Sequence, residues 1–109
     1  MSNGSLYTEI QNNIATVEFF HPASNSFPSE LLVRLATAFN ELSLNSEVHV
    51  IVLKSEKEKA FCAGASFDEL VAISKFEDGK QFFLGFANVL NAMRNCSKIS
   101  IVRVQGKAV

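Results

Sequence analysis

The stretch of sequence that decides the fold is Lys59-Ala-Phe-Cys-Ala-Gly-Ala-Ser-Phe-Asp-Glu-Leu70. Before it, residues 48–53 form an almost unbroken apolar run rich in β-branched side chains, which is typical of a strand buried on both faces. Within it, Ser66 and Glu69 stand three residues apart in a capping-box pattern, which predicts that a helix begins at Ser66. The sequence therefore predicts a strand, a loop of small residues and a capped helix.

The small residues of that loop, Cys62 to Ala65, leave its main chain open to another molecule. Gly64 can adopt a positive φ and allows a ligand to approach the backbone closely. The first turn of the following helix has N–H groups without intrahelical partners and carries partial positive charge. These groups suit an anion, or a carbonyl oxygen about to become one. The structural alternative is that a strand-to-helix turn merely needs small residues to pack.

The chain upstream of this stretch predicts a β–β–α–β order. Leu6 to Gln11 and Ile14 to Phe20 are expected to form two strands joined by a tight turn at Asn12-Asn13, because Asn tolerates the left-handed conformation. A helix follows near Pro28, and its apolar stripe is Leu31, Leu32, Leu35, Phe39 and Leu42. The buried strand Val48 to Lys54 and a solvated, charge-alternating loop at residues 55–59 then lead into the deciding stretch.

The chain downstream predicts two helices and a last strand. The capped helix is expected to break around residues 77–79, and a longer helix to run from about Lys80 to Asn95. The apolar face of the longer helix is predicted to be Phe82, Phe83, Phe86, Val89, Leu90 and Met93. Residues 99–104 are then predicted to form another buried strand.

Three motifs resemble those of the enoyl-CoA hydratase/isomerase (crotonase) family. Phe61-Cys-Ala-Gly-Ala65, followed by the capped helix, is similar to the family motif F-x-A-G-A-D. Pro22-Ala-Ser-Asn25 fits a P-x-x-N-type turn, and Val104-Gln-Gly106 fits a V-x-G sequence that precedes a Gly-rich segment. The resemblance implies an α/β fold, the N-terminal part of a crotonase-type ββα superhelix, with residues 1–109 as one portion of a single domain. Ser66 stands where the family usually has Asp, so a negative charge near the acyl site is missing.

The resemblance also implies roles for particular residues. The backbone N–H of Ala65 would be one of two oxyanion-hole donors that polarise a thioester carbonyl and stabilise the enolate formed beside it. The same loop and the start of the helix would hold the CoA and acyl groups, and the early loop would contact the CoA moiety; these substrate-binding residues are Ala23, Ser24, Ala63, Gly64, Ala65, Ser66, Phe67 and Asp68. The side chains of Phe82, Phe83 and Phe86 are expected to belong to the core. The alternative is that they border the acyl pocket.

The expected function is acyl-CoA binding with enolate stabilisation, serving hydration of a 2,3-enoyl-CoA or double-bond isomerisation. The alternatives are another crotonase reaction (acyl-CoA hydrolysis, C–C bond cleavage or dehalogenation) and a non-catalytic α/β fragment. Because the chain stops at Val109, one step beyond a core strand, we expect a fragment that lacks the second donor and the acid and base residues. The 109-residue chain alone is therefore expected to be inactive.

Composition excludes several other classes of function. The net charge of −1 and the pI near 6.1 give no reason to expect a nucleic-acid partner, and no apolar run approaches a membrane span. Two cysteines and no signal peptide fit a cytoplasmic protein. His21 and His49 are isolated and Cys62 is expected to be a structural thiol, so neither a metal nor a separate cofactor is predicted; CoA enters as part of the substrate. A full-length form is expected to be a homo-oligomer, a trimer or a hexamer.

Overall fold

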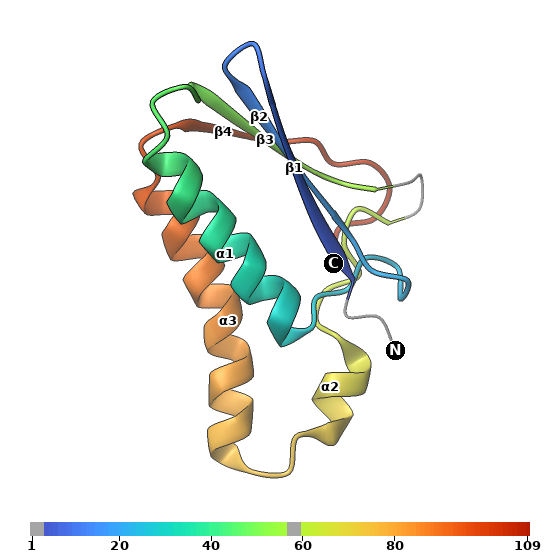
Figure 1. The fold of residues 1–109 in the computed structure, drawn as a ribbon. Helices are drawn as coiled ribbons and strands as arrows, with labels where there is room; N and C mark the ends of the chain where they lie inside the picture. The colour runs from blue at the N-terminus through green and yellow to red at the C-terminus, as the bar shows by residue number, and fades with distance from the viewer. Residues whose placement is uncertain (1–3, 57–59) are drawn as a thin grey trace.

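The computed structural model describes residues 4–56 and 60–109, and these form a four-stranded sheet with helices packed on it (Figure 1). The strands β1 (Ser5–Gln11), β2 (Ile14–Phe20), β3 (Val50–Ser55) and β4 (Ile99–Val102) lie side by side in that order. β1 is antiparallel to β2, and the β2–β3 and β3–β4 pairs are parallel. Lys59, at the start of the deciding stretch, and the middle of the predicted charged loop lie outside the described residues.

The first two strands form the predicted hairpin. Asn12 and Asn13 have φ angles of 54° and 66°, so both central residues of the turn are left-handed. Two successive left-handed residues give a turn whose twist matches that of the flanking strands. Gln11 consequently pairs directly with Ile14, and the register of the hairpin follows from the turn.

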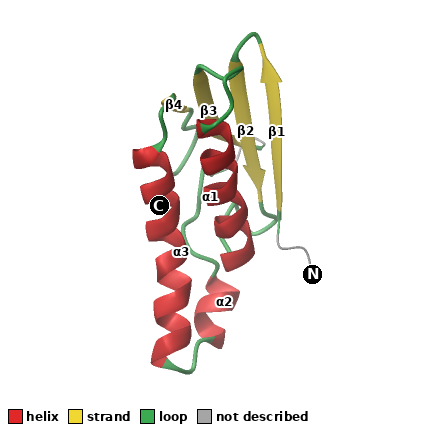
Figure 2. Cartoon of the chain, turned by 60° about the vertical axis from the view of Figure 1, so that its left-hand side comes forward, coloured by secondary structure: helices red, strands yellow, loops and turns green. Residues whose placement is uncertain are grey.

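Helices α1 (Ser29–Ser43) and α3 (Phe76–Asn95) lie side by side over one face of the sheet, and the short α2 (Phe67–Ala72) precedes α3 (Figure 2). The two long helices approach closely at Gly85, where a Cβ atom would lie 3.1 Å from Leu32 Cδ1. A side chain at residue 85 would therefore press against Leu32, and glycine avoids this contact. None of the helices in the described part of the chain is long and apolar enough to span a membrane.

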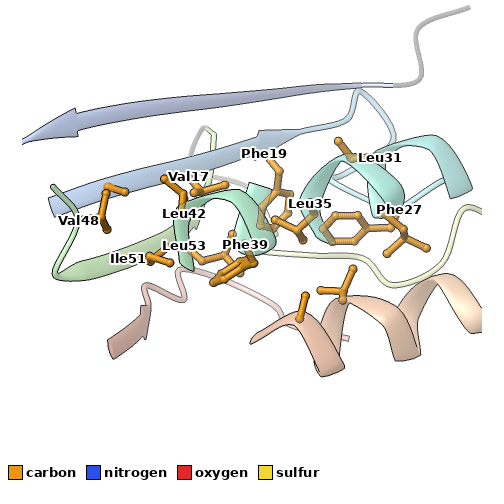
Figure 3. Packing of buried hydrophobic residues seen from close by; sticks show 14 of the residues in the cluster. Val17, Phe19, Phe27, Leu31, Leu35, Phe39, Leu42, Val48, Ile51 and Leu53 are labelled. Carbon is orange, nitrogen blue, oxygen red and sulfur yellow. The ribbon is translucent and has the colours of Figure 1, made fainter. Parts of the chain in front are cut away.

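The core lies between the sheet and the two long helices, α1 and α3 (Figure 3). All five residues predicted for the apolar stripe of α1 are buried. They pack against the side chains that β2 and β3 direct to the same face; these are Ala15, Val17, Phe19, Ile51 and Leu53. The helical periodicity of the stripe and the period-two alternation of the strands together account for this layer.

Only one face of the sheet is covered by helices, so the prediction of strands buried on both faces is wrong for the described chain. In β3, buried Ile51 and Leu53 alternate with half-buried Val50 and Val52. β4 pairs with β3 on one side only, and its Ile99 is 66% exposed. β4 is also shorter than predicted and ends at Val102.

The predicted break between the second and third helices is displaced. α2 ends at Ala72 and α3 begins at Phe76, so residues 77–79 lie in the first turn of α3. The acidic Glu77 and Asp78 are well placed there, because the positive end of the helix dipole favours negative charge. On the predicted apolar face of α3, Phe82 and Val89 are buried. Phe83 and Leu90, which were assigned to the same face, are exposed.

Candidate functional site

The loop between β3 and α2, residues 60–66, is paired along one side with the segment that precedes α1. The Phe27 N–H donates to the Gly64 carbonyl oxygen at 2.8 Å, and the Ser66 N–H donates to the Phe27 carbonyl oxygen at 2.9 Å. These two bonds form an isolated parallel β-bridge between Phe27 and Ala65. The loop therefore has the geometry of a short strand at this point.

The start of the same loop is paired with residues near the end of the chain. The N–H groups of Phe61 and Cys62 both donate to the Lys107 carbonyl oxygen, at 2.8 and 3.3 Å, and the Val109 N–H donates to the Cys62 carbonyl oxygen at 2.9 Å. The loop is thus held between two segments that are distant from it in sequence.

The N–H of Ala65 is directed away from both bonds of the Phe27 bridge. A trans peptide is planar, so the Gly64 carbonyl and the Ala65 N–H point in opposite directions. Because the carbonyl of Gly64 points to Phe27, the Ala65 N–H points to the other side of the loop. Within residues 4–56 and 60–109, no hydrogen bond engages this N–H.

The N–H of Gly64 is bonded within the loop. It donates to the Sγ atom of Cys62 at 3.3 Å, and Gly64 has a φ of 94° as its sequence position predicted. The sequence suggested that the amides of the Gly64–Ala65 corner would both be open to a ligand. Among the described residues, the Ala65 amide has no hydrogen-bond partner, whereas the Gly64 amide donates to the Cys62 thiol.

Ser66 is the N-cap of α2, as predicted, and its Oγ accepts a hydrogen bond from the Glu69 N–H at 3.3 Å. The reciprocal half of the capping box does not form, because the Ser66 N–H is already bonded to Phe27. The Glu69 carboxylate instead accepts from the Ser29 N–H at 2.8 Å and from the Ser29 Oγ. Glu69 thus joins α2 to the N-terminus of α1, where the helix dipole favours a carboxylate.

Replacing Glu69 with alanine is expected to lower the free energy of unfolding by about 1–3 kcal/mol, since two charge-assisted hydrogen bonds at a helix terminus are lost. Urea denaturation followed by circular dichroism measures this loss. Asp68→Asn is the matched control, because it removes the neighbouring, exposed carboxylate of the same helix. Equal destabilisation by both variants would contradict the role of the contact with Ser29.

Asn25 connects the two loops of the candidate site, which the sequence analysis did not anticipate. Its side chain is buried: the Oδ1 atom accepts from the His21 N–H at 2.9 Å, and the Nδ2 atom donates to the carbonyl oxygens of Glu56 and Ala60 at 3.2 and 2.9 Å. Glu56 and Ala60 flank residues 57–59, which lie outside the described structure. The available signal was the P-x-x-N turn itself, in which Asn25 adopts a left-handed φ of 59°.

Aromatic side chains support the loop from the core side. Phe61 meets Phe19 edge-to-face with ring centroids 5.3 Å apart, and Phe19 lies 4.7 Å from Phe27 by the same measure. Phe27 in turn contacts Phe86 of α3 at 6.4 Å. Edge-to-face and tilted pairs at these distances are favourable, so the rings fix the loop and its bridging partner on the same surface.

An apolar cavity of about 280 Å³ lies beside Gly64 and Cys62. Its walls come from the sheet, α1, α3 and the end of the chain, and include Phe27, Phe86 and Leu90. Of the three phenylalanines in the predicted stripe, Phe86 lines this cavity, and a border of the stripe on an acyl pocket stays a prediction. A larger open hollow of about 670 Å³, between Ile73 and Leu84, touches none of the predicted site residues.

The remaining predicted residues lie around the same two loops. Ala23 and Ser24 are exposed in the loop before α1, where the Ala23 N–H donates to the His21 Nδ1 atom at 3.0 Å. Ala63 is half-buried in the central loop, and Phe67 and Asp68 are exposed in the first turn of α2. Asn25 and Phe27 hold these loops together, so the predicted CoA-contacting residues occur in neighbouring segments. Their roles stay predictions.

Burial raises the pKa of the Cys62 thiol above its ordinary value, while the hydrogen bond from Gly64 acts in the opposite direction. At neutral pH the group is therefore a thiol and a weak nucleophile. Across the described residues, no group of three or more His, Cys, Asp or Glu side chains could hold a metal ion.

A raised thiol pKa makes stability depend on pH in the alkaline range. As the pH rises above the ordinary thiol value, about 8.5, the unfolded chain loses the Cys62 proton first, so unfolding becomes easier. Urea denaturation at pH 7 and pH 10 is expected to show a smaller loss of stability in Cys62→Ser than in the unmodified chain. Identical pH dependence in Cys62→Ser and the unmodified chain would contradict the burial of the thiol.

Comparison with known proteins relates the chain to one sequence family. The sequence model of the enoyl-CoA hydratase/isomerase family matches residues 9–109. The protein YngF of Bacillus subtilis (strain 168), provisionally assigned to enoyl-CoA hydratase/isomerase, is 30% identical over 76 residues, which are 69% of this chain and 29% of YngF. The 6-oxocyclohex-1-ene-1-carbonyl-CoA hydrolase of Geobacter metallireducens (strain ATCC 53774 / DSM 7210 / GS-15) is 25% identical over 87 residues, 78% of this chain and 23% of the hydrolase.

The fold is also that of solved structures. A crystal structure of an enoyl-CoA hydratase/carnithine racemase from Magnetospirillum magneticum superposes with a TM-score of 0.84 at 26% identity, covering 95% of this chain and 41% of that one. The chain therefore spans less than half the length of these relatives, and the predicted crotonase-type α/β fold is confirmed for this part. With the family pattern extending over nearly all of its residues, the chain belongs to the enoyl-CoA hydratase/isomerase family.

Proposed function

We propose that the chain forms part of an acyl-CoA site in which the Ala65 N–H donates a hydrogen bond to the thioester carbonyl oxygen. The observation that carries the proposal is that this N–H points away from the Phe27 bridge and has no hydrogen-bond partner in the described chain. Family membership supports acyl-CoA as the ligand, because the relatives named above include enzymes of CoA thioesters.

The proposed chemistry is stabilisation of an enolate. When a proton is removed from, or a nucleophile adds to, an acyl group conjugated with a thioester, negative charge develops on the carbonyl oxygen. A backbone N–H that is already fixed stabilises this charge without reorganising, and more strongly in a site that excludes water. Ala65 contributes through its main chain, so its side chain only has to be small.

The apolar cavity beside Gly64 and Cys62 is the proposed place of the acyl chain. Its walls are almost entirely hydrocarbon and aromatic, and an acyl chain transferred there from water gains about 0.8 kcal/mol for each buried methylene group. The exposed residues Ala23 and Ser24 remain the proposed contacts of the CoA moiety, and Phe67 and Asp68 remain proposed residues of the acyl-CoA groove.

The proposed reaction of a complete family domain is hydration or isomerisation of an enoyl-CoA. A second candidate is hydrolysis of an acyl-CoA substrate, because the Geobacter relative at 25% identity is named a 6-oxocyclohex-1-ene-1-carbonyl-CoA hydrolase. Both reactions use an oxyanion donor, and they differ in the groups that transfer protons or activate water. A cytoplasmic location and assembly into a trimer or hexamer stay predictions.

Titration of the isotope-labelled chain with butyryl-CoA, followed by amide NMR, tests the proposal. We expect the Ala65 resonance to move downfield as its N–H gains a carbonyl acceptor, while free CoA, which has no thioester carbonyl, should not produce this downfield shift. An unchanged Ala65 resonance at saturating butyryl-CoA would refute the proposal. The same sample assayed with crotonyl-CoA tests the expectation that the chain alone has no hydratase turnover.

A further inference from the structure

We infer that Cys62 is a positioning residue for the Ala65 donor: its sulfur accepts the Gly64 N–H and so fixes the peptide that precedes the donor. This inference rests on the proposed function, because it assigns the thiol a role in aiming the same N–H. It gives Cys62 neither a nucleophilic nor a metal-binding role.

The geometry of the corner requires two anchors. Gly64 has no Cβ atom and can rotate through conformations that other residues avoid, so its φ of 94° must be fixed by its neighbours. The bond from the Phe27 N–H to the Gly64 carbonyl, 2.8 Å long, fixes the peptide plane after Gly64. The bond from the Gly64 N–H to Cys62 Sγ, 3.3 Å long, fixes the plane before it.

With both planes fixed, the direction of the Ala65 N–H is determined. The Gly64 carbonyl and the Ala65 N–H share one planar peptide, so rotation at Gly64 would swing the donor and stretch the bond to Phe27 together. Without the sulfur contact, only the two hydrogen bonds of the Phe27 bridge would oppose that rotation. The Cys62 sulfur therefore disfavours a competing orientation of the loop. It also accepts the Gly64 N–H, which the proposed site does not use for the ligand.

The environment of Cys62 suits this role. Its main chain is held on both sides by Lys107 and Val109, so the sulfur is presented from a fixed backbone. The Sγ atom also lies 4.0 Å from the Gly64 carbonyl oxygen, toward which the thiol hydrogen can point. Since burial keeps the group protonated, the sulfur is a neutral acceptor and introduces no negative charge beside a site that must stabilise an oxyanion.

Three substitutions of Cys62 test separately the hydrogen-bond acceptor and the volume of its side chain. Cys62→Ser keeps an acceptor at the γ position, Cys62→Val fills the space without an acceptor, and Cys62→Ala removes both. Cys96→Ala is the matched control, because it deletes the other free thiol at the C-terminal end of α3.

Amide hydrogen exchange of the 109-residue chain is the decisive measurement. We expect the Gly64 N–H to exchange roughly tenfold faster in the Val and Ala variants, as for loss of one hydrogen bond, and to remain protected in Cys62→Ser and Cys96→Ala. With butyryl-CoA, the shift of the Ala65 resonance should shrink in the Val and Ala variants and be retained in the Ser variant.

Two results would overturn the inference. Unchanged Gly64 exchange in Cys62→Val would show that the sulfur does not hold this amide. Fast Gly64 exchange in Cys62→Ser together with protection in Cys62→Val would show that packing, rather than an acceptor, matters at this position. Failure of the proposed function is distinguishable, because it appears as an unresponsive Ala65 resonance in the unmodified chain whatever the exchange rates are.

Discussion

Ala65→Pro is expected to lower the turnover of an active, complete form of the protein by about 100- to 1000-fold, the usual cost of one missing oxyanion donor. Proline removes the N–H that the proposal requires and nothing else that the loop uses for pairing. The bridge to Phe27 is made by the Gly64 carbonyl and the Ser66 N–H, so both of its hydrogen bonds can persist in the variant. Steady-state kinetics with crotonyl-CoA give the loss in kcat, and calorimetry gives the loss in affinity of the 109-residue chain for butyryl-CoA.

Ala65→Gly is the control for that experiment. It changes the side chain but keeps the N–H, so activity and butyryl-CoA affinity should stay within a few-fold of the original. Comparable values for the proline and glycine variants would show that the N–H of residue 65 takes no part in binding or turnover. Circular dichroism of both variants excludes a general loss of fold.

Asn25→Gly is expected to lower the free energy of unfolding by about 3 kcal/mol, because three hydrogen bonds of a buried side chain are lost at about 1 kcal/mol each. Glycine accepts the left-handed φ of 59°, so the loss reports the side chain and not backbone strain. The same substitution should weaken butyryl-CoA binding, since Asn25 holds the loop before α1 against the start of the central loop. Urea denaturation and calorimetry measure the two effects.

Asn12→Gly provides the matched comparison, because Asn12 is also left-handed but is exposed in the hairpin turn. Its free energy of unfolding should change by about 0.5 kcal/mol or less. If Asn12→Gly lowered the free energy of unfolding as much as Asn25→Gly, the hydrogen bonds from Asn25 to Glu56 and Ala60 would not account for the loss of stability.

Local patterns predicted most of the fold. The stripe from Leu31 to Leu42 identified α1 and its buried face, and the Asn12-Asn13 pair identified the hairpin, because both features depend on residues close together in sequence. The N-cap at Ser66 was predicted for the same reason. The strand-to-helix order around the central loop followed from the apolar run before it and the cap after it.

The missed features depend on partners far away in the chain. Glu69 was assigned to its own helix, but its carboxylate binds Ser29, 40 residues earlier. The carbonyl of Ala60 is held by Asn25, 35 residues away, and no local pattern indicates such a contact. The boundary between α2 and α3 was misplaced because Glu77 and Asp78 were taken to indicate a loop. At a helix N-terminus these acidic side chains are stabilising.

The edge of the sheet at β4 has a practical consequence for every experiment on this chain. Its outer row of main-chain donors and acceptors can template a strand from another molecule, and exposed Ile99 and Ile101 make such pairing hydrophobic as well. A concentrated sample would then oligomerise through this edge independently of any assembly that serves the acyl-CoA site. Dilution series, or a lysine placed at Ile101, would keep the two kinds of association apart.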